Sequence, residues 1–243
     1  MTLYLHETHR VRGEFEDDVA AAFRDPGGWM DLLGADSADG EGDDARLLWY
    51  ATQVHGTGPS YRITTVTAVR DGAAWERLAR RIATGDLADW ARRVDGLRHD
   101  VTAKVLLAVP WSPIGDIDLA AESTTPADHE PTLFMEDTGW PHVPIDDYLR
   151  FWEEVYLPLL ARSPEDARLL EIQACWTPAL GAGRRPEGVL WQRIHSHERL
   201  LDLFRTELPP ERKAPGTYMA DALTYRDQWE SRLLRTASWS PRW

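Results

Sequence analysis

The stretch Leu3-Tyr4-Leu5-His6-Glu7-Thr8 returns as Leu133-Phe134-Met135-Glu136-Asp137-Thr138, later in a chain of 243 residues. Shorter matches follow in the same order along both halves of the chain. They are Ala45–Leu48 with Ala167–Leu170, Glu76–Leu78 with Glu198–Leu200, and Trp111–Pro113 with Trp239–Pro241. Four collinear matches, separated by gaps of loop size, predict that the chain is an internal duplication.

Each half carries the same order of elements: strand, helix, strand, strand, helix, strand. The periodicity of apolar residues predicts these elements in both halves. The expected strands span 2–8, 47–54, 61–69, 103–109, 132–138, 168–176, 187–194 and 232–237. The expected helices span 14–23, 71–82, 87–97, 145–160, 196–206 and 218–229. The order βαββαβ is that of a ferredoxin-like unit, whose helices cover only one face of its sheet. The predicted fold class is therefore α+β, with two tandem ferredoxin-like units closing one pseudo-dimeric barrel.

Charge is concentrated in two stretches. The chain has a net charge of −13, and residues 34–44 and 113–131 each hold five acids and no base. Both stretches are rich in Gly, Pro, Ser and Thr, which is typical of solvated loops. We therefore expect a first unit at 1–113, an acidic linker at 114–130 and a second unit at 131–243. The acidity argues against nucleic-acid binding and against an anionic membrane surface as partner.

Cysteine usage and the N-terminal sequence also indicate the compartment in which the protein resides. Cys175 is the single cysteine, so no intramolecular disulfide can form, as is usual in a reducing environment. The N-terminal MTLYLHETHR lacks the basic and apolar regions of a signal peptide. No apolar run approaches the roughly 18 residues of a membrane span. The sequence therefore predicts a cytoplasmic protein with no membrane partner.

Several motifs resemble the NIPSNAP family of the dimeric α+β barrel superfamily. They are Tyr4–Thr8, Tyr156-Leu157-Pro158, Tyr225–Leu234 and the closing Trp239-Ser240-Pro241. The resemblance implies the barrel fold, but it carries no catalytic residue across, because the family has no generally agreed reaction. The chain departs from the family pattern in fusing two units. Fusion lets the halves diverge, so one asymmetric pocket can replace two equivalent ones.

Strand alternation predicts the side chains that face the barrel interior. On the first strand of each half, His6 and Glu136 point inward beside aromatic neighbours. On the second strand we assign the more polar face to the interior. The expected substrate-binding residues are Tyr4, Trp49, Gln53, Phe134, Gln173, Cys175 and Trp191. Aromatic walls with a few convergent polar groups are typical of a small-molecule pocket.

The expected catalytic residues are His6, Glu136 and Glu171. A histidine beside a buried carboxylate can exchange protons near neutral pH, so His6 with Glu136 or Glu171 would form an acid–base pair. The alternative interpretation is a satisfied polar network in the core, or groups at strand ends in water.

The sequence predicts neither a metal nor a cofactor. His195-Ser196-His197 could present two ligands from a strand, but the repeat places it at a helix start, with Ser196 as the N-cap. Some haem enzymes also use two ferredoxin-like units per chain. Nothing in this sequence, however, distinguishes one histidine as the axial ligand that haem iron would need. Cys175 fits a small buried hydrophobe better than a nucleophile. Phosphate-binding and nucleophile-elbow motifs are absent.

The leading hypothesis is a cofactor-independent enzyme acting on a hydrophobic small molecule by acid–base chemistry, with polycyclic molecules among the candidates. Cyclisation, isomerisation or dehydration would suit it. Cofactor-free oxygenation is a variant, since relatives in the superfamily oxidise aromatic polyketides without metal or flavin. Two alternatives are a non-catalytic carrier and a protein-interaction module. Buried ionisable groups around an open cavity favour the enzyme, an apolar cavity favours the carrier, and a filled interior favours the module. Association into a homodimer stays open.

Overall fold

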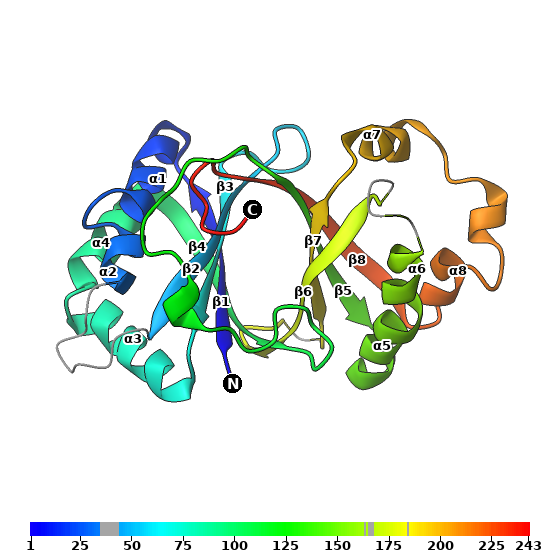
Figure 1. The fold of residues 1–243 in the computed structure, drawn as a ribbon, viewed down its shortest axis with the longest axis horizontal. Helices are drawn as coiled ribbons and strands as arrows, with labels where there is room; N and C mark the ends of the chain where they lie inside the picture. Colours follow the sequence, from blue (N-terminus) through cyan, green and yellow to red (C-terminus); the bar gives the residue numbers. More distant parts are fainter. Residues whose placement is uncertain (35–43, 163, 165–167, 184) are drawn as a thin grey trace.

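A closed eight-stranded barrel forms the centre of the computed structural model, which describes residues 1–34, 44–162, 164, 168–183 and 185–243 (Figure 1). The strands are β1 (Leu3–Val11), β2 (Ala45–Gln53), β3 (Arg62–Val69), β4 (Arg98–Ala108), β5 (Leu133–Pro141), β6 (Leu170–Leu180), β7 (Gly188–Ile194) and β8 (Arg226–Thr236). Their order around the ring is β1-β3-β2-β8-β5-β7-β6-β4, and every neighbouring pair is antiparallel. The predicted fold class is confirmed.

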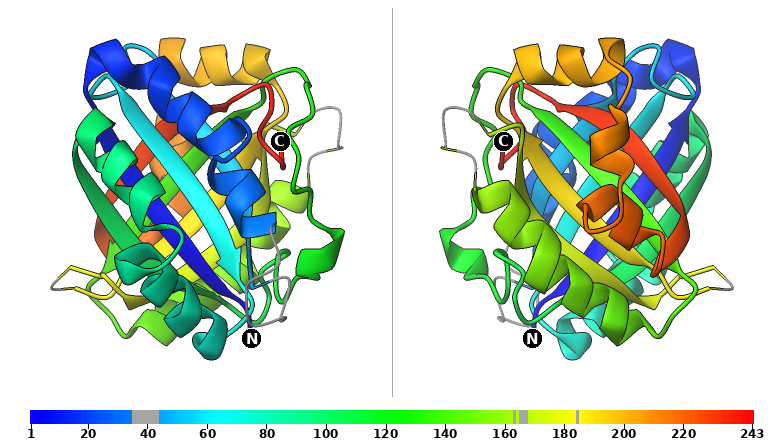
Figure 2. Two further views of the ribbon diagram at one scale, coloured as in Figure 1. Left: turned by 90° about the vertical axis from the view of Figure 1, so that its left-hand side faces the viewer. Right: turned by 90° about the vertical axis from the view of Figure 1, so that its right-hand side faces the viewer.

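Helices cover the outside of the barrel in two groups, one for each half of the chain (Figure 2). The first group is η1 (Gly13–Phe15), α1 (Glu16–Arg24), α2 (Trp29–Gly34), α3 (Gly72–Thr84) and α4 (Ala88–Leu97). The second is α5 (Ile145–Phe151), the π-helical η3 (Trp152–Tyr156), α6 (Leu157–Ala161), α7 (His197–Arg205), η5 (Pro210–Lys213) and α8 (Tyr218–Ala222). A further short helix, η2 (Leu119–Ala121), lies between the halves. Each group packs its apolar residues on the outer face of its own strands.

Two elements differ from the prediction. The expected helix 218–229 is wrong beyond Ala222, because β8 already begins at Arg226 and pairs with Pro141 of β5. The ladder with β5 outweighs the weak helical preference of the segment. The short helix α2 was not expected; its Trp29 and Met30 are buried against the first group of helices.

Strand pairing shows how the two halves correspond. His6 lies opposite Val66, and Glu136 lies opposite Trp191 in the same way. β2 and β6 each contain a register shift, between Leu47 and Trp49 and between Ile172 and Ala174. These registers make Trp49 equivalent to Ala174. The sequence match of Ala45–Leu48 with Ala167–Leu170 would instead make Trp49 equivalent to Glu171, three residues earlier. Since β1 and β5 are four antiparallel steps apart, they run in the same direction, and the pseudo-twofold axis follows the barrel axis.

One end of the barrel is sealed. The segment joining the halves and the C-terminal tail cross in front of the ring in Figure 1. Ile114 and Leu119 pack into the interior cluster, and the Tyr4 hydroxyl donates a hydrogen bond to the Gly115 carbonyl. The Arg242 guanidinium pairs with the Glu122 carboxylate and ties the tail to the segment. The opposite end is therefore the one through which a molecule could enter.

The topology supports the proposal that the chain consists of units 1–113 and 131–243 joined by 114–130. Most of the first acidic stretch, 35–43, lies outside the described residues. In the parts of the chain that the structure describes, no helix has the length and apolarity needed to cross a membrane.

Candidate functional site

Aromatic side chains fill the middle of the barrel. Trp191 contacts three other rings, with centroids 5.7 Å from Trp49, 5.3 Å from Phe134 and 6.5 Å from Trp176. Tyr4 packs on Trp176 at 5.5 Å. All five are almost completely buried. These rings form an aromatic layer that separates the sealed end of the barrel from the open end.

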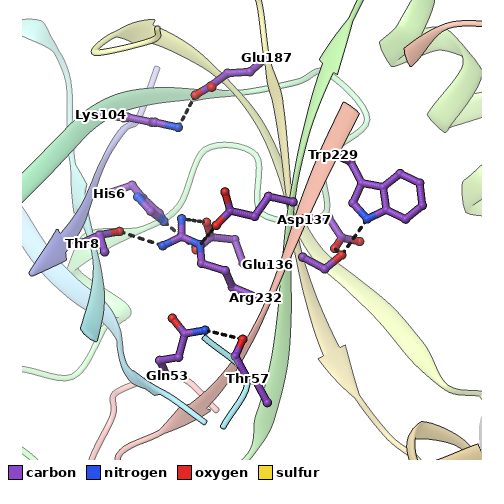
Figure 3. A network of polar contacts seen from close by, with 12 residues as sticks. His6, Thr8, Gln53, Thr57, Lys104, Glu136, Asp137, Glu187, Trp229 and Arg232 are labelled. Atoms are coloured by element: carbon purple, nitrogen blue, oxygen red, sulfur yellow. Dashed lines mark hydrogen bonds and ion pairs between the residues drawn. The ribbon is translucent and has the colours of Figure 1, made fainter. Parts of the chain in front are cut away.

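A buried polar cluster, drawn in Figure 3, begins two residues beyond Tyr4 on β1 and two residues beyond Phe134 on β5. The Nε2 atom of His6 lies 3.0 Å from Oε2 of Glu136, and both side chains are at most 5% exposed. These two residues occupy equivalent positions in the repeat, so they meet near the pseudo-twofold axis. Arg232 of β8 donates to the other Glu136 oxygen and, at 3.2 Å, to the Thr8 hydroxyl. Divergence of the two halves has thus set a histidine opposite a carboxylate.

The charges fix the protonation state of Glu136. Burial would raise the pKa of this carboxyl, but His6 and Arg232 beside it outweigh burial and hold the pKa at about 2. Glu136 is therefore ionised at neutral pH. An ionised partner at Nε2 favours the tautomer in which His6 carries its proton there and leaves Nδ1 free to accept one.

A second ion pair crosses the open end. Lys104 of β4 pairs with Glu187, which precedes β7 and is 3% exposed. The indole Nε1 of Trp140 donates to the other Glu187 oxygen at 2.9 Å. This pair spans β6, the strand between β4 and β7 in the ring. It links the two halves at the rim.

The open end contains a cavity of about 190 Å³. Every residue that lines it carries a polar or charged group: His6, Thr8, Arg10, Arg62, Asp100, Thr102, Lys104, Glu230 and Arg232. We call this cavity the barrel mouth. Its volume lies below the roughly 300–1,000 Å³ of sites for drug-sized ligands, so it suits a compact molecule.

The expected substrate-binding residues lie elsewhere. Tyr4, Trp49, Phe134 and Trp191 belong to the aromatic layer, where they contact each other and line no part of the mouth. Gln53 lies near the rim, where its amide donates to the Thr57 carbonyl at 3.1 Å (Figure 3). Their expected role as a ligand-binding wall stays a prediction without geometric support.

Glu171 does not join His6. Glu171 and Phe134 are both paired with Arg193, so Glu171 lies on the sealed side of the His6–Glu136 contact. Its carboxylate instead contacts His195 Nε2 at 2.9 Å and the Gln173 amide at 2.8 Å. Of the two carboxylates proposed as partners of His6, the structure brings only Glu136 to it.

Cys175 is on the other face of β6 from the expected one. It packs among residues of the second helical group, because the register shift after Ile172 reverses the alternation and turns Ala174 and Trp176 inward. Burial raises the pKa of its thiol well above the ordinary value. We therefore expect no labelling of Cys175 by Ellman's reagent in the folded protein and one thiol per chain in denaturant. Rapid labelling without denaturant would contradict this placement.

The cluster suits neither a metal nor haem. Among the described residues, no three His, Cys, Asp or Glu side chains gather as metal ligands. Ser196 caps α7 by accepting from the Arg199 amide, as expected, and His195 is held by Glu171. Haem beside His6 would need room for the porphyrin ring, and the aromatic layer fills the barrel interior next to this cluster.

Arg62, Lys104 and Arg232 were missed by the sequence interpretation. The repeat contained a signal for two of them, because Lys104 and Arg232 lie opposite His6 and Glu136 in the ladders. Both residues lie within the expected strands 103–109 and 232–237, but strand alternation was applied only to the first two strands of each half, so neither was assigned to the interior.

Comparison with solved structures agrees with the topology. A protein from Lactobacillus acidophilus NCFM described as a "putative monooxygenase" covers 98% of this chain and 96% of its own, with a TM-score of 0.53 and 10% identity. An anthrone oxidase-like protein covers 97% and 91%, with a TM-score of 0.57 and 10% identity. The chain has the dimeric α+β barrel fold. At this identity the likeness shows the fold alone.

Comparisons of sequence give no closer assignment. No family model matches the chain, and no curated protein matches it. A NIPSNAP family protein from Agrobacterium tumefaciens str. C58 covers 47% of this chain and 99% of its own, with 17% identity and a TM-score of 0.35. A likeness of that size carries no argument, so the NIPSNAP resemblance stays a prediction.

Proposed function

We propose that the chain is an enzyme whose barrel mouth performs acid–base chemistry on a small molecule, with His6 as the proton-transferring residue. One observation carries the proposal: His6 lines a solvent-connected cavity while its Nε2 atom is held by a buried, ionised Glu136. Perturbed and coupled ionisable groups in a cavity are typical of active sites. Solved proteins of the same fold include ones described as monooxygenases and as anthrone oxidase-like, so the fold accommodates enzymes.

The proposed mechanism begins with removal of a proton from the substrate. Nδ1 of His6 accepts the proton, and the carboxylate of Glu136 stabilises the imidazolium that forms. Arg232 keeps Glu136 ionised by donating to its carboxylate. The hydrogen bond from Arg232 to Thr8 holds the guanidinium in place beside that carboxylate. The same imidazolium can return the proton to another atom. Cyclisation, isomerisation, dehydration and cofactor-free oxygenation all share this first step.

The lining favours a compact polar substrate over the hydrophobic polycycle suggested by the sequence. The aromatic side chains that would receive a polycycle fill their own space in the layer below. Every residue around the mouth carries a charged or polar group. For the same reason the carrier hypothesis loses support, because the apolar interior holds side chains and no described apolar cavity opens from the barrel.

A homodimer is a further proposal. The seams between the halves, β2 with β8 and β4 with β6, are both formed within one chain. A second copy would therefore attach to the outside of the closed barrel and not by completing it.

The test is hydrogen exchange at an activated carbon. Pyruvate, 2-oxobutyrate, phenylpyruvate and neutral acetone are incubated with the protein in D2O, and loss of the proton signal next to the carbonyl is followed by NMR. We expect exchange faster than in buffer for at least one oxo acid. His6→Gln keeps a hydrogen-bond donor toward Glu136 but cannot take up a proton, so the excess exchange should fall by about 100-fold or more.

Arg150→Gln is the control, because Arg150 lies on the outer helix α5 in an exposed ion pair with Asp147. Its exchange rate should equal that of the unaltered protein. The proposal fails if no oxo acid exchanges faster than in buffer, or if His6→Gln keeps the full rate while circular dichroism shows it folded.

A further inference from the structure

The repeat equates positions around the barrel mouth. His6 lies opposite Lys104, and its equivalent Glu136 lies opposite Arg232, so Lys104 and Arg232 correspond. Thr64 lies opposite Thr8, and Val189 lies opposite Thr138. Thr64 and Val189 are therefore equivalent. The residues two positions before them, Arg62 at the start of β3 and Glu187 just before β7, are equivalent as well.

This correspondence exposes a broken symmetry. On one side of the mouth Lys104 crosses β6 to pair with Glu187. The equivalent pair on the other side is Arg232 with Arg62, separated by β2. The second side therefore has two guanidinium groups at the positions where the first side has the cation of Lys104 and the anion of Glu187. Both line the same cavity, so the missing negative charge has space to be supplied from outside.

Arg62 is ready to bind such a charge. Among the described residues its side chain forms no hydrogen bond or ion pair, and its Nε atom is buried with no partner. Leaving a buried charged donor unsatisfied is costly, so a bound acceptor would be stabilising. Arg232 contributes positive charge, although its own nitrogens are engaged by Glu136, Thr8 and, at 3.6 Å, Glu230.

The acids of the mouth do not replace that partner. Asp100 is paired with Arg10 at 2.7 Å, and both side chains are about half exposed. Glu230 is 55% exposed and faces Arg232. A water-screened carboxylate at the rim does little to neutralise the partly buried side chain of Arg62. The lining thus leaves the positive charge of Arg62 without a charged partner among the described residues.

We propose that the barrel mouth binds the oxyanion of a small molecule, foremost a carboxylate, between Arg62 and Arg232. A guanidinium holds a carboxylate through paired N–H groups, which orients the rest of the molecule. His6 lines the same cavity, so the carbon chain of the bound acid would lie near its ring. The inference rests on the proposed function and deepens it, because it names the substrate as a small organic acid.

Binding is measured by isothermal titration calorimetry at low salt, with pyruvate, its neutral amide pyruvamide and inorganic phosphate as separate probes. We expect pyruvate to bind and pyruvamide not to bind. Binding of phosphate as tightly as pyruvate would assign the site to oxyanions in general, whereas weaker phosphate binding would assign it to planar carboxylates. Affinity should fall as salt rises, since the interaction is electrostatic.

Two variants of Arg62 test the residue. Arg62→Gln should lower the affinity for pyruvate about tenfold or more, as expected for loss of a charged hydrogen-bond donor. Arg62→Glu copies the Lys104–Glu187 pair by facing Arg232 with a carboxylate. It should abolish binding while the melting temperature stays the same or rises, which separates lost binding from lost folding. Glu230→Gln should tighten pyruvate binding, and Arg150→Gln should leave it unchanged.

The inference is overturned if the unaltered protein binds none of the anions, if pyruvate and pyruvamide bind equally, or if Arg62→Glu keeps the original affinity. The exchange assay distinguishes this failure from that of the proposed function. Exchange that depends on His6 but survives in Arg62→Glu would leave the function standing without the anion site. Binding that depends on Arg62, with no exchange on any oxo acid, would leave the site without the reaction.

Discussion

Replacing Glu136 with glutamine is expected to lower the free energy of unfolding at pH 7 by about 3 kcal/mol. The carboxylate is 1% exposed, and its removal leaves the Arg232 guanidinium in the barrel without its ionised partner. Breaking one side of a buried ion pair costs roughly 3–5 kcal/mol. The pKa gives a similar figure: a fall from 4.5 to about 2 corresponds to about 3 kcal/mol at 1.36 kcal/mol per unit.

The pH dependence has a definite sign. The pKa of Glu136 in the folded protein lies below its unfolded value, so the carboxylate stabilises the fold fully above pH 4.5. That contribution disappears as pH falls toward 2. Urea unfolding of both proteins between pH 7 and pH 2.5 should therefore show the difference shrinking on acidification. Comparing the two proteins removes the contributions of the titrating groups that do not interact with Glu136.

Glu230→Gln is the matched control. Glu230 faces the same Arg232 from a half-exposed position at 3.6 Å, where an ion pair is worth at most about 1 kcal/mol. A loss in Glu136→Gln no larger than in this control, or one that stays constant down to pH 2.5, would contradict the assignment of Glu136 as an ionised buried group.

Truncating Trp191 to alanine is expected to cost about 4 kcal/mol of unfolding free energy. Trp191 is 0% exposed and contacts the rings of Trp49, Phe134 and Trp176, which come from both halves. Removing a buried aromatic ring typically costs roughly 3–5 kcal/mol, because transfer energy is lost and a cavity remains. Guanidinium unfolding measures the change.

Trp229→Ala provides the comparison on the surface. Trp229 is 45% exposed and its ring lies under the Arg226 guanidinium, so its loss should cost about 1 kcal/mol or less. Trp191→Phe should cost clearly less than Trp191→Ala, because it keeps a ring and removes an indole N–H that has no acceptor. Equal losses at positions 191 and 229 would show that the aromatic layer does not hold the barrel together.

Much of the fold was accessible from the sequence, and the reason is the repeat. The alignment of the stretches beginning at Leu3 and Leu133 predicted the two halves, and it named His6 and Glu136 as equivalent interior residues. Equivalent residues on strands beside a pseudo-twofold axis can touch, and these two do. Their catalytic role was a prediction from the sequence and remains one that the exchange assay must test.

The remaining features depended on details that alternation alone cannot supply. One extra residue in the register of β6 turned Ala174 inward and Cys175 outward. The filling of the interior by Trp49, Trp191 and their neighbours depends on the barrel radius and not on any one strand. Arg62 could be recognised as a candidate binding residue only from the strand pairing, which makes it equivalent to Glu187. In the sequence its neighbours resemble the start of an ordinary strand.

The two seams that close the barrel have a consequence for the protein at low abundance. A barrel assembled from separate chains comes apart on dilution, since its closure depends on the concentration of partners. Here β2 meets β8 and β4 meets β6 within one chain, at a fixed effective concentration set by the connecting segment. A single molecule therefore holds a complete mouth, and the number of mouths equals the number of chains however dilute the protein is.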